Sequence, residues 1–296
     1  MTFHGSLVAL VTPFKNGKVD EKALTRLVRR QLQAGTDGIV PAGTTGECPT
    51  LSFREHERVI EVAVEAAGGE LPVVAGTGAN STEEAIRLTR FAKKAGADGA
   101  LMVTPYYNKP TQEGLYRHYE AVARQVDIPI VLYNVPSRTG VSLAPETVAR
   151  LSRIRSIVAI KEATGSMDQA SHILSLCGIT VLSGDDSLTL PLMALGAKGV
   201  ISVIANVVPE AVAEMTDSFS KGDHVRAKEL HYKMFPLCRA MFIETNPIPV
   251  KKAMGLLGLC SEELRLPLCP MREPHEKILV SAMKDYGLSL KKRSGR

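Results

Sequence analysis

The sequence predicts an α/β protein with a (β/α)8 TIM barrel and a C-terminal helical extension. Short apolar segments recur eight times along its 296 residues, and most are continuous runs rather than alternating patterns. Such runs are typical of strands buried on both faces, as in parallel sheets. Segments with helical periodicity separate them, so the chain repeats a strand–helix unit, as a closed barrel of parallel strands requires. The predicted strands are Ser6–Val11, Gly38–Pro41, Pro72–Ala75, Gly99–Val103, Pro129–Tyr133, Ile157–Ile160, Thr180–Leu182 and Gly199–Ile204.

The helical segments between these strands carry recognisable start and stop signals. Asp20 is placed to cap the first helix, and Gly35 is placed to end it. Ser81 and Glu84 have the spacing of a capping box at the start of a later helix. The predicted helices are Asp20–Ala34, Arg54–Ala67, Ser81–Ala95, Gln112–Gln125, Pro145–Leu151, Asp168–Leu176 and Leu188–Leu195.

About 90 residues follow the eighth predicted strand. We assign residues 1–224 to the barrel, 225–290 to a helical domain and 291–296 to a basic, disordered tail. The competing architecture is a doubly wound open sheet, but no Gly-x-Gly-x-x-Gly follows the first strand. Helical patterns in the last part of the chain cover Pro209–Ser220, His224–Ile243, Asn246–Leu257 and Pro274–Tyr286.

Composition excludes several classes of function. Lys and Arg number 36 against 31 Asp and Glu, and four of the basic residues lie in the last six positions, so a basic nucleic-acid-binding face is not expected. No apolar run approaches the roughly 18 residues that span a bilayer, so no membrane segment is expected. Five cysteines without a Cys-x-x-Cys pair favour a reducing cytosol and a cytoplasmic location. Scattered histidines without zinc-site spacing argue against a metal site.

Lys161 directly follows the apolar run of the sixth predicted strand. Functional residues of such barrels lie where strands end. A free lysine has a pKa near 10.4, and burial in a barrel mouth can lower this pKa to about 7 or below. The neutral amine can then attack a ketone and form a Schiff base. The alternative is a structural lysine that is solvated or paired with an acid such as Glu162.

The neighbouring strand ends supply groups that suit this chemistry. Tyr133 ends the fifth strand, about 4.8 Å from the sixth, and a phenol can transfer protons. Thr44 and Thr45 lie in a Gly-Thr-Thr-Gly-Glu turn that can hold a carboxylate. Arg138 can bind a carboxylate through two parallel hydrogen bonds. The structural alternatives are a core aromatic for Tyr133 and a surface ion pair for Arg138.

Two further pairs of residues follow strands. Tyr106 and Tyr107 are adjacent, so only one of them is expected to face the local pocket. Asp185 and Asp186 can bind substrate hydroxyls or a cation, or they can cap the following helix.

Several motifs, in their order and spacing, resemble the dihydrodipicolinate synthase family of pyruvate-dependent class I aldolases, which also contains N-acetylneuraminate lyase. The resemblance extends from about residue 4 to residue 288, and it implies a (β/α)8 barrel that assembles as a homotetramer of two tight dimers. It also implies condensation of pyruvate with L-aspartate-4-semialdehyde, the entry step of lysine and diaminopimelate biosynthesis, with no metal or organic cofactor. The motifs are Gly43–Glu47, Tyr133–Gly140, Lys161–Thr164 and Glu244–Lys251.

The resemblance assigns roles to residues at matching positions. Lys161 forms the imine with pyruvate. Thr44, Tyr133 and Tyr107 form a proton relay, with Tyr107 supplied across the tight dimer interface.

The remaining substrate contacts are assigned in the same way. Thr45 helps to bind the pyruvate carboxylate, and Arg138 binds the carboxylate of the aldehyde. The backbone of Gly184 and Ile201 lines the pocket near the lysine. Sister lyases that act on sugar acids lack an arginine in this loop, so Arg138 favours the synthase. A sister lyase and a non-catalytic ligand-binding barrel are the alternatives.

A possible second site for lysine is also implied. Some family members are inhibited by lysine at the tight dimer interface. Cys48 and Phe53 depart from the serine and histidine of lysine-sensitive relatives, so we expect weak or absent inhibition. The residues that match the lysine site are Asn80, Glu84, His56 and Tyr106.

Overall fold

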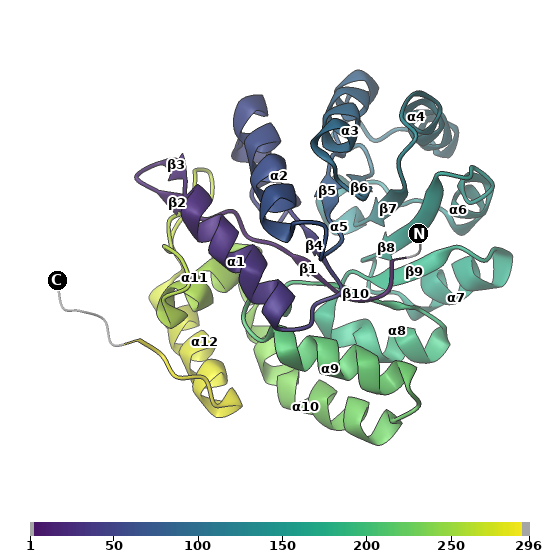
Figure 1. The fold of residues 1–296 in the computed structure, drawn as a ribbon. Coiled ribbons are helices and arrows are strands. Elements are labelled where there is room, and N and C mark those ends of the chain that lie inside the picture. The colour runs from purple at the N-terminus through teal and green to yellow at the C-terminus, as the bar shows by residue number, and fades with distance from the viewer. Residues whose placement is uncertain (1–2, 292–296) are drawn as a thin grey trace.

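The computed structural model describes residues 3–291, and within them eight parallel strands form a closed barrel (Figure 1). A parallel bridge between Ile39 and Val73 joins the two ends of the sheet, and the Ile39 amide donates to the Pro72 carbonyl over 2.9 Å. This closure confirms the predicted barrel and contradicts the open-sheet alternative. The strands are hydrogen-bonded in the order β4 (Gly38–Val40), β1 (Gly5–Ala9), β10 (Gly199–Ser202), β9 (Thr180–Ser183), β8 (Ile157–Glu162), β7 (Ile130–Asn134), β6 (Gly99–Val103) and β5 (Val74–Gly76).

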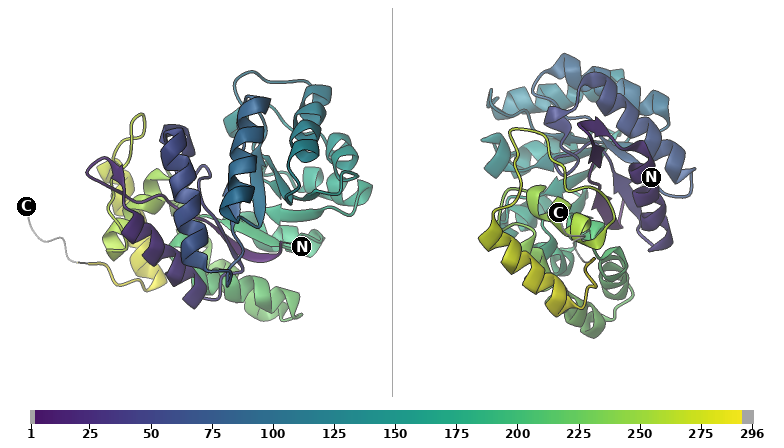
Figure 2. Two further views of the ribbon diagram at one scale, coloured as in Figure 1. Left: turned by 45° about the horizontal axis from the view of Figure 1, so that its top comes forward. Right: turned by 90° about the vertical axis from the view of Figure 1, so that its left-hand side faces the viewer.

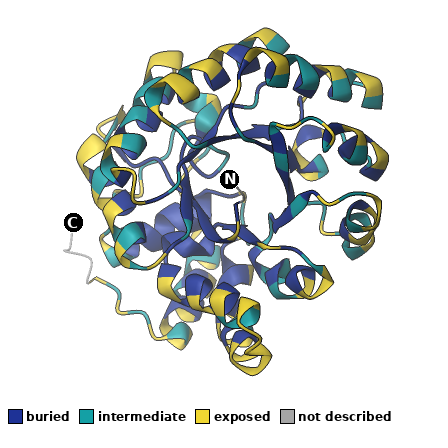
Figure 3. Ribbon diagram, turned by 45° about the vertical axis from the view of Figure 1, so that its right-hand side comes forward, coloured by how far each residue is buried: buried dark blue, intermediate teal, exposed yellow. Residues whose placement is uncertain are grey.

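An outer layer of helices surrounds the strands, and Figure 3 shows buried strands inside helices whose outer faces are exposed. Asp20 caps α1 by accepting from the Ala23 amide, as predicted. Ser81 caps α3 by accepting from the Glu84 amide, which is one half of the predicted capping box. The outer helices are α1 (Glu21–Gln33), α2 (Phe53–Ala67), α3 (Thr82–Ala95), α4 (Gln112–Gln125), α6 (Pro145–Leu151), α7 (Met167–Leu176), α8 (Thr189–Leu195) and α9 (Pro209–Ser220).

Three helices follow the barrel: α10 (His224–Ala240), α11 (Ile248–Leu257) and α12 (Glu273–Tyr286). They lie on the outside of the barrel (Figures 1 and 2), and α10 packs against both α9 and α12. Their apolar side chains belong to the same hydrophobic cluster as those of α1 and α2, so the extension is anchored to the barrel wall. Of the predicted basic tail, Lys291 donates its amide to the Leu256 carbonyl, and residues 292–296 lie outside the described residues.

Several short elements at the carboxyl ends of the barrel strands were not predicted. Each has only two to four residues, too few for a periodic pattern. These elements are the hairpin of β2 (Phe14–Lys15) and β3 (Lys18–Val19), the 3-10 turns η1 (Cys48–Thr50), η2 (Asp186–Leu188) and η3 (Ile204–Asn206), and the short helix α5 (Pro136–Thr139). Two of them line cavities at the mouth of the barrel, η1 through Cys48 and α5 through Arg138.

Candidate active site

Lys161 lies inside the mouth of the barrel with only 5% of its surface exposed. Its strand, β8, pairs with β7 in a register that sets Lys161 opposite Tyr133. The Lys161 Nζ is 4.4 Å from the centroid of the Tyr133 ring. The predicted proximity of these two side chains is therefore confirmed.

The surroundings of Lys161 favour its neutral form. Burial lowers the pKa of Lys161 to about 8; the Asp186 carboxylate opposes this shift, and the Arg138 guanidinium adds to it. Within residues 3–291, Lys161 forms no ion pair. The Glu162 carboxylate instead accepts hydrogen bonds from the Asn134 side chain and the Thr164 amide. The structural alternative, a lysine paired with Glu162, is therefore wrong.

Tyr133 is buried beside the lysine and keeps its proton. Burial raises the pKa of the Tyr133 phenol, although Arg138 and hydrogen bonding with Thr44 pull this pKa down. A protonated phenol next to a neutral amine can donate a proton to an oxygen that forms between them and can take it back. Tyr133 and Thr44 are thus placed for proton transfer.

The Gly43–Glu47 turn is tight, as its two glycines suggested. The amides of Gly46 and Cys48 both donate to the Gly43 carbonyl, over 3.0 and 3.3 Å. Thr45 is buried in this turn, and its Oγ1 accepts a 3.0 Å hydrogen bond from the Asn246 Nδ2. Because the Thr45 hydroxyl is the acceptor in this bond, its proton remains available for a ligand carboxylate.

These groups line one inner cavity of about 200 Å³. Gly184 is required there, because a Cβ at this position would lie 2.5 Å from the Ala163 Cβ and 3.1 Å from the Lys161 Cε. Ile201, by contrast, is buried in the barrel core, and Val203 lines the cavity in its place. The structure brings together six of the predicted site residues in this cavity: Lys161, Tyr133, Thr44, Thr45, Arg138 and Gly184.

Arg138 lies on α5 at the mouth of the cavity. Its Nη2 donates to the backbone carbonyl of Asn246 over 3.2 Å. Among the residues that the structure describes, Arg138 has no acidic partner, so the surface ion-pair alternative is wrong. The other guanidinium N–H groups are therefore free to bind an anion.

The C-terminal extension contributes residues to the site that sequence reasoning missed. Asn246 and Phe242 line the inner cavity. Lys251 is fully buried, and its Nζ lies 2.7 Å from the Glu47 Oε1 and 3.1 Å from the Thr12 carbonyl. Both Asn246 and Lys251 lie in the Glu244–Lys251 motif, which carried the family resemblance but had no assigned role. The extension thus holds the Gly43–Glu47 turn at two points.

The two adjacent tyrosines point in different directions, as predicted. Tyr106 lines a second cavity of about 470 Å³ together with Thr44 and Arg138. Tyr107 is 90% exposed, has a left-handed backbone with φ of 74°, and lies outside the inner cavity of its own chain. Among the described residues of one chain, Tyr133 and Thr44 are therefore the predicted relay residues that line the cavity with Lys161.

The second cavity also gathers the residues of the possible lysine site. His56 and Glu84 line it, and the Asn80 Nδ2 donates to the Tyr106 carbonyl over 3.3 Å. Burial lowers the pKa of His56 to about 4, so this imidazole is neutral. Phe53 lines the same cavity, with the Arg87 guanidinium 4.3 Å from its ring centroid.

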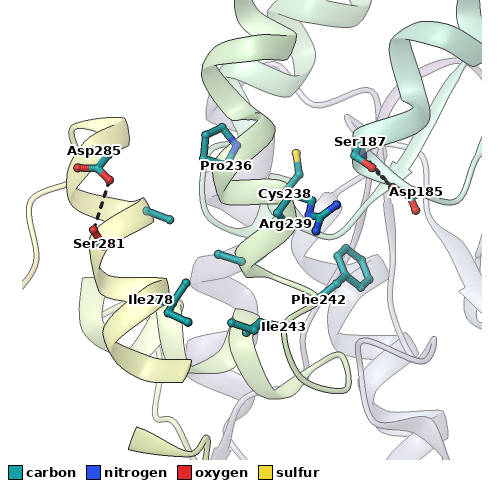
Figure 4. A pocket seen from close by; sticks show the side chains of 12 residues that line it. Asp185, Ser187, Pro236, Cys238, Arg239, Phe242, Ile243, Ile278, Ser281 and Asp285 are labelled. Carbon is teal, nitrogen blue, oxygen red and sulfur yellow. Dashed lines mark hydrogen bonds between the residues drawn. The ribbon is translucent and has the colours of Figure 1, made fainter. Parts of the chain in front are cut away.

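A larger outer hollow of about 630 Å³ lies between α10, α12 and η2 (Figure 4). It shares Asp185 and Phe242 with the inner cavity, so the two are neighbours. Asp185 caps η2 by accepting from the Ser187 amide, and Asp186 accepts from the amides of Val203 and Ile204. The capping alternative is therefore confirmed for Asp185.

Residues 3–291 contain no group of three His, Cys, Asp or Glu side chains arranged to hold a metal ion. Over the same range, no helix is both long and apolar enough to cross a membrane.

The fold and the cavity together define the class: a (β/α)8-barrel enzyme with a buried lysine in the mouth of the barrel. The model of the dihydrodipicolinate synthetase family matches residues 2–286. The chain belongs to this family.

Individual relatives agree with this assignment. The 4-hydroxy-tetrahydrodipicolinate synthase of Geobacter sulfurreducens is 61% identical over 97% of this chain and 99% of its own. The crystal structure of dihydrodipicolinate synthase from Aquifex aeolicus is 55% identical, with a TM-score of 0.96 over 98% of this chain and all of the other. A third structure, the chloride-inhibited dihydrodipicolinate synthase of Acinetobacter baumannii complexed with pyruvate, is 50% identical, with a TM-score of 0.94 over 97% of this chain and 99% of its own.

Proposed function

We propose that the protein condenses pyruvate with L-aspartate-4-semialdehyde to form 4-hydroxy-tetrahydrodipicolinate, the first committed step of lysine and diaminopimelate biosynthesis. The observation that carries this proposal is the buried Lys161, with its lowered pKa, in a cavity that also holds Tyr133, Thr45 and Arg138. The shared name of close relatives, and a pyruvate complex of one of them, support it.

The first half of the reaction forms an imine. The neutral Lys161 amine attacks the keto carbon of pyruvate, whose carboxylate binds to Thr45 and the free amides of its turn. Tyr133 and Thr44 pass protons between the nitrogen and the departing oxygen, which leaves as water. The iminium then accepts the electron pair released when a proton leaves the methyl carbon, and an enamine forms.

The second half forms the carbon–carbon bond. Arg138 binds the carboxylate of the aldehyde substrate, and the enamine carbon attacks the aldehyde carbon, whose oxygen takes a proton to become a hydroxyl. The substrate amine then attacks the imine carbon, which closes the ring and releases the Lys161 amine. Electrons move only between substrate and imine, so the scheme uses neither a metal nor an organic cofactor. Gly184 leaves room for the lysine at this end of the pocket.

The proposed assembly explains the position of Tyr107. This side chain is exposed in one chain and suits a role in the cavity of a second copy, across a tight dimer interface. We propose a homotetramer of two such dimers that works in the cytoplasm, with small-molecule substrates and without nucleic-acid or membrane partners. We propose that residues 1–224 form the catalytic barrel and that residues 225–290 form the helical domain.

The second cavity is proposed as a weak lysine site. Asn80, Glu84, His56 and Tyr106 supply polar groups, but Phe53 replaces a polar contact with an aromatic ring. A polar ligand group left without a partner lowers affinity. We therefore propose weak or absent inhibition by lysine.

A steady-state assay that holds pyruvate constant and varies the aldehyde tests the function. Turnover should strongly prefer L-aspartate-4-semialdehyde over sugar-like aldehydes that lack its carboxylate, because Arg138 binds this group. Equal use of both classes would indicate a sister lyase. Binding of pyruvate without turnover of any aldehyde would indicate a non-catalytic barrel.

A further inference from the structure

Asp186 is a buried carboxylate at the wall of the inner cavity, and the scheme above gives it no role. It lies in η2, and only 6% of its surface is exposed. Its Oδ2 accepts hydrogen bonds from the amides of Val203 and Ile204, over 2.9 and 3.0 Å, and Val203 lines the inner cavity. Burial raises the pKa of Asp186, whereas these two amides and the Ser202 hydroxyl lower it, because each of them binds the charged form.

The Asp186 carboxylate acts electrostatically on the Lys161 amine. Gly184, two positions before Asp186, lies against the lysine, since a Cβ there would be 3.1 Å from the Lys161 Cε. Burial lowers the pKa of Lys161, and two charged groups add to this effect: Asp186 raises the pKa and Arg138 lowers it. The carboxylate of Glu162, the next residue on β8, accepts other hydrogen bonds. Asp186 is therefore the negative charge that acts on this nitrogen.

Imine formation creates a positive charge at this buried nitrogen. The neutral amine, the keto group of pyruvate and one proton give an iminium and one water, so the nitrogen carries a full charge after the step. A buried charge without a counter-charge is costly. A carboxylate that backbone amides hold in place can stabilise this charge for as long as the imine exists.

We propose that Asp186 is the counter-ion of the Lys161 iminium, a positioning residue that acts through the lysine and stabilises the imine with pyruvate. This inference rests on the proposed function and deepens it. The same negative charge stabilises the ammonium form of the free lysine. Asp186 therefore makes the amine less reactive at neutral pH and makes the imine more stable once it has formed.

The other charged and titratable groups around this pair lie on several elements. Tyr133, on β7, stays protonated because burial raises its pKa. Cys238, on α10, interacts electrostatically with Asp186, and burial raises the pKa of this thiol, so it stays neutral. Arg138, on α5, carries a constant positive charge. Asp185 adds a negative charge next to Asp186 and thereby raises the pKa of Asp186.

Asp186→Asn removes the charge but keeps the hydrogen bonds. Both amides donate to a single oxygen, so the oxygen of the new side-chain amide can accept from them, and the turn should stay folded. We expect the midpoint of the pH profile for imine formation, measured by stopped flow, to move to lower pH by on the order of one unit. Asp185→Asn is the matched control, because it removes a carboxylate from the same turn, and it should leave the midpoint unchanged.

The affinity for pyruvate distinguishes a counter-ion from a structural support. At pH 9 the free lysine is mostly neutral and only the iminium is charged, so the Kd of pyruvate should rise about tenfold in Asp186→Asn. At pH 6 the lysine nitrogen is charged both before and after imine formation, so the Kd should change less than about twofold. Calorimetric titration with pyruvate at the two pH values gives both constants, and thermal unfolding verifies the fold.

Three results would overturn the proposal: an unchanged midpoint in folded Asp186→Asn, an equal loss of pyruvate affinity at both pH values, or a shift of the same size in Asp185→Asn. If Asp186→Asn does not fold, Asp186→Ser takes its place, because it is also neutral and carries an acceptor oxygen, and it must show the same shift. Failure of the wild-type protein to form any borohydride-trapped imine with pyruvate would contradict the proposed function, and this inference with it.

Discussion

Lys161 and Tyr133 face each other across two neighbouring barrel strands, with the lysine nitrogen 4.4 Å from the centre of the tyrosine ring. The contact follows directly from strand register, because both residues lie at the carboxyl ends of strands that pair residue by residue. Burial acts on the two groups in opposite directions: it lowers the pKa of the amine and raises the pKa of the phenol. At pH 7 an amine with a pKa of about 8 is neutral in roughly one molecule in ten, against about one in a few thousand for a free lysine, and in those molecules it lies beside a protonated phenol.

Replacement of Tyr133 by phenylalanine tests the phenol as a proton-transfer group. The aromatic ring stays, so the barrel core should remain packed and the thermal midpoint should change little. Loss of one such group costs on the order of 10² to 10⁴ in rate, and we expect kcat to fall by this factor. The check is steady-state kinetics alongside thermal unfolding. Unchanged kcat in a folded variant would show that the relay is misassigned.

Arg138→Ala should affect binding of the aldehyde much more than it affects imine formation with pyruvate. The guanidinium binds the aldehyde carboxylate in the proposed scheme, so the KM of the aldehyde should rise strongly. A charged hydrogen bond contributes about 1.5–3 kcal/mol, which corresponds to roughly 10- to 150-fold. Stopped-flow measurement of pyruvate imine formation should show a much smaller effect. Equal damage to both steps would contradict this division of roles.

The pH dependence of imine formation follows from the pKa of about 8 for Lys161. Below this pH the neutral fraction of the amine increases about tenfold per pH unit, so the second-order rate with pyruvate should rise with the same slope. Above pH 8 the amine is mostly neutral and the rate should level off. The Tyr133 pKa is raised, so loss of its proton does not limit the rate in this window. A rate that still climbs tenfold per unit between pH 9 and 10 would indicate an ordinary exposed lysine.

The buried ion pair between Lys251 and Glu47 should be important for stability. Lys251→Met leaves the Glu47 carboxylate buried without its cation, and breaking such a pair costs about 3–5 kcal/mol. We expect this loss in the free energy of unfolding, measured by urea denaturation. Lys277→Met is the matched control, because the Lys277–Glu273 pair is exposed and contributes at most about 1 kcal/mol. Similar losses in the two variants would contradict the role of the buried pair.

Much of the fold could be predicted because strands that are buried on both faces appear in the sequence as continuous apolar runs. The predicted strand Gly99–Val103 is β6 itself, whereas the segment Pro72–Ala75 was placed too early because Val73 forms only the single bridge that closes the barrel. The elements at the mouth could not be predicted. The 3-10 turn at Cys48–Thr50 and the short helix at Pro136–Thr139 depend on local hydrogen bonds rather than on periodicity.

Some residues of the candidate site could likewise be predicted from the sequence, and others could not. Lys161 and Tyr133 could be predicted from their positions at strand ends, and strand pairing then brings them together. Asn246 lies 201 positions from Thr45, and Lys251 lies 204 positions from Glu47. These contacts arise because the C-terminal extension packs against the barrel. The sequence around each residue contains no pattern that identifies its distant partner. The role proposed for Tyr107 requires a second copy of the chain, because this side chain is exposed within one chain.

Reductive trapping of the enzyme with pyruvate and borohydride tests the central claim most directly. Borohydride reduces an imine to a stable secondary amine, so peptide mass spectrometry should find one pyruvate-sized addition on Lys161. Lys161→Ala should show no addition at any other lysine, including the buried Lys251. An unmodified Lys161 in the wild-type protein, or an equal addition in the alanine variant, would contradict the claim that this amine captures the oxo acid.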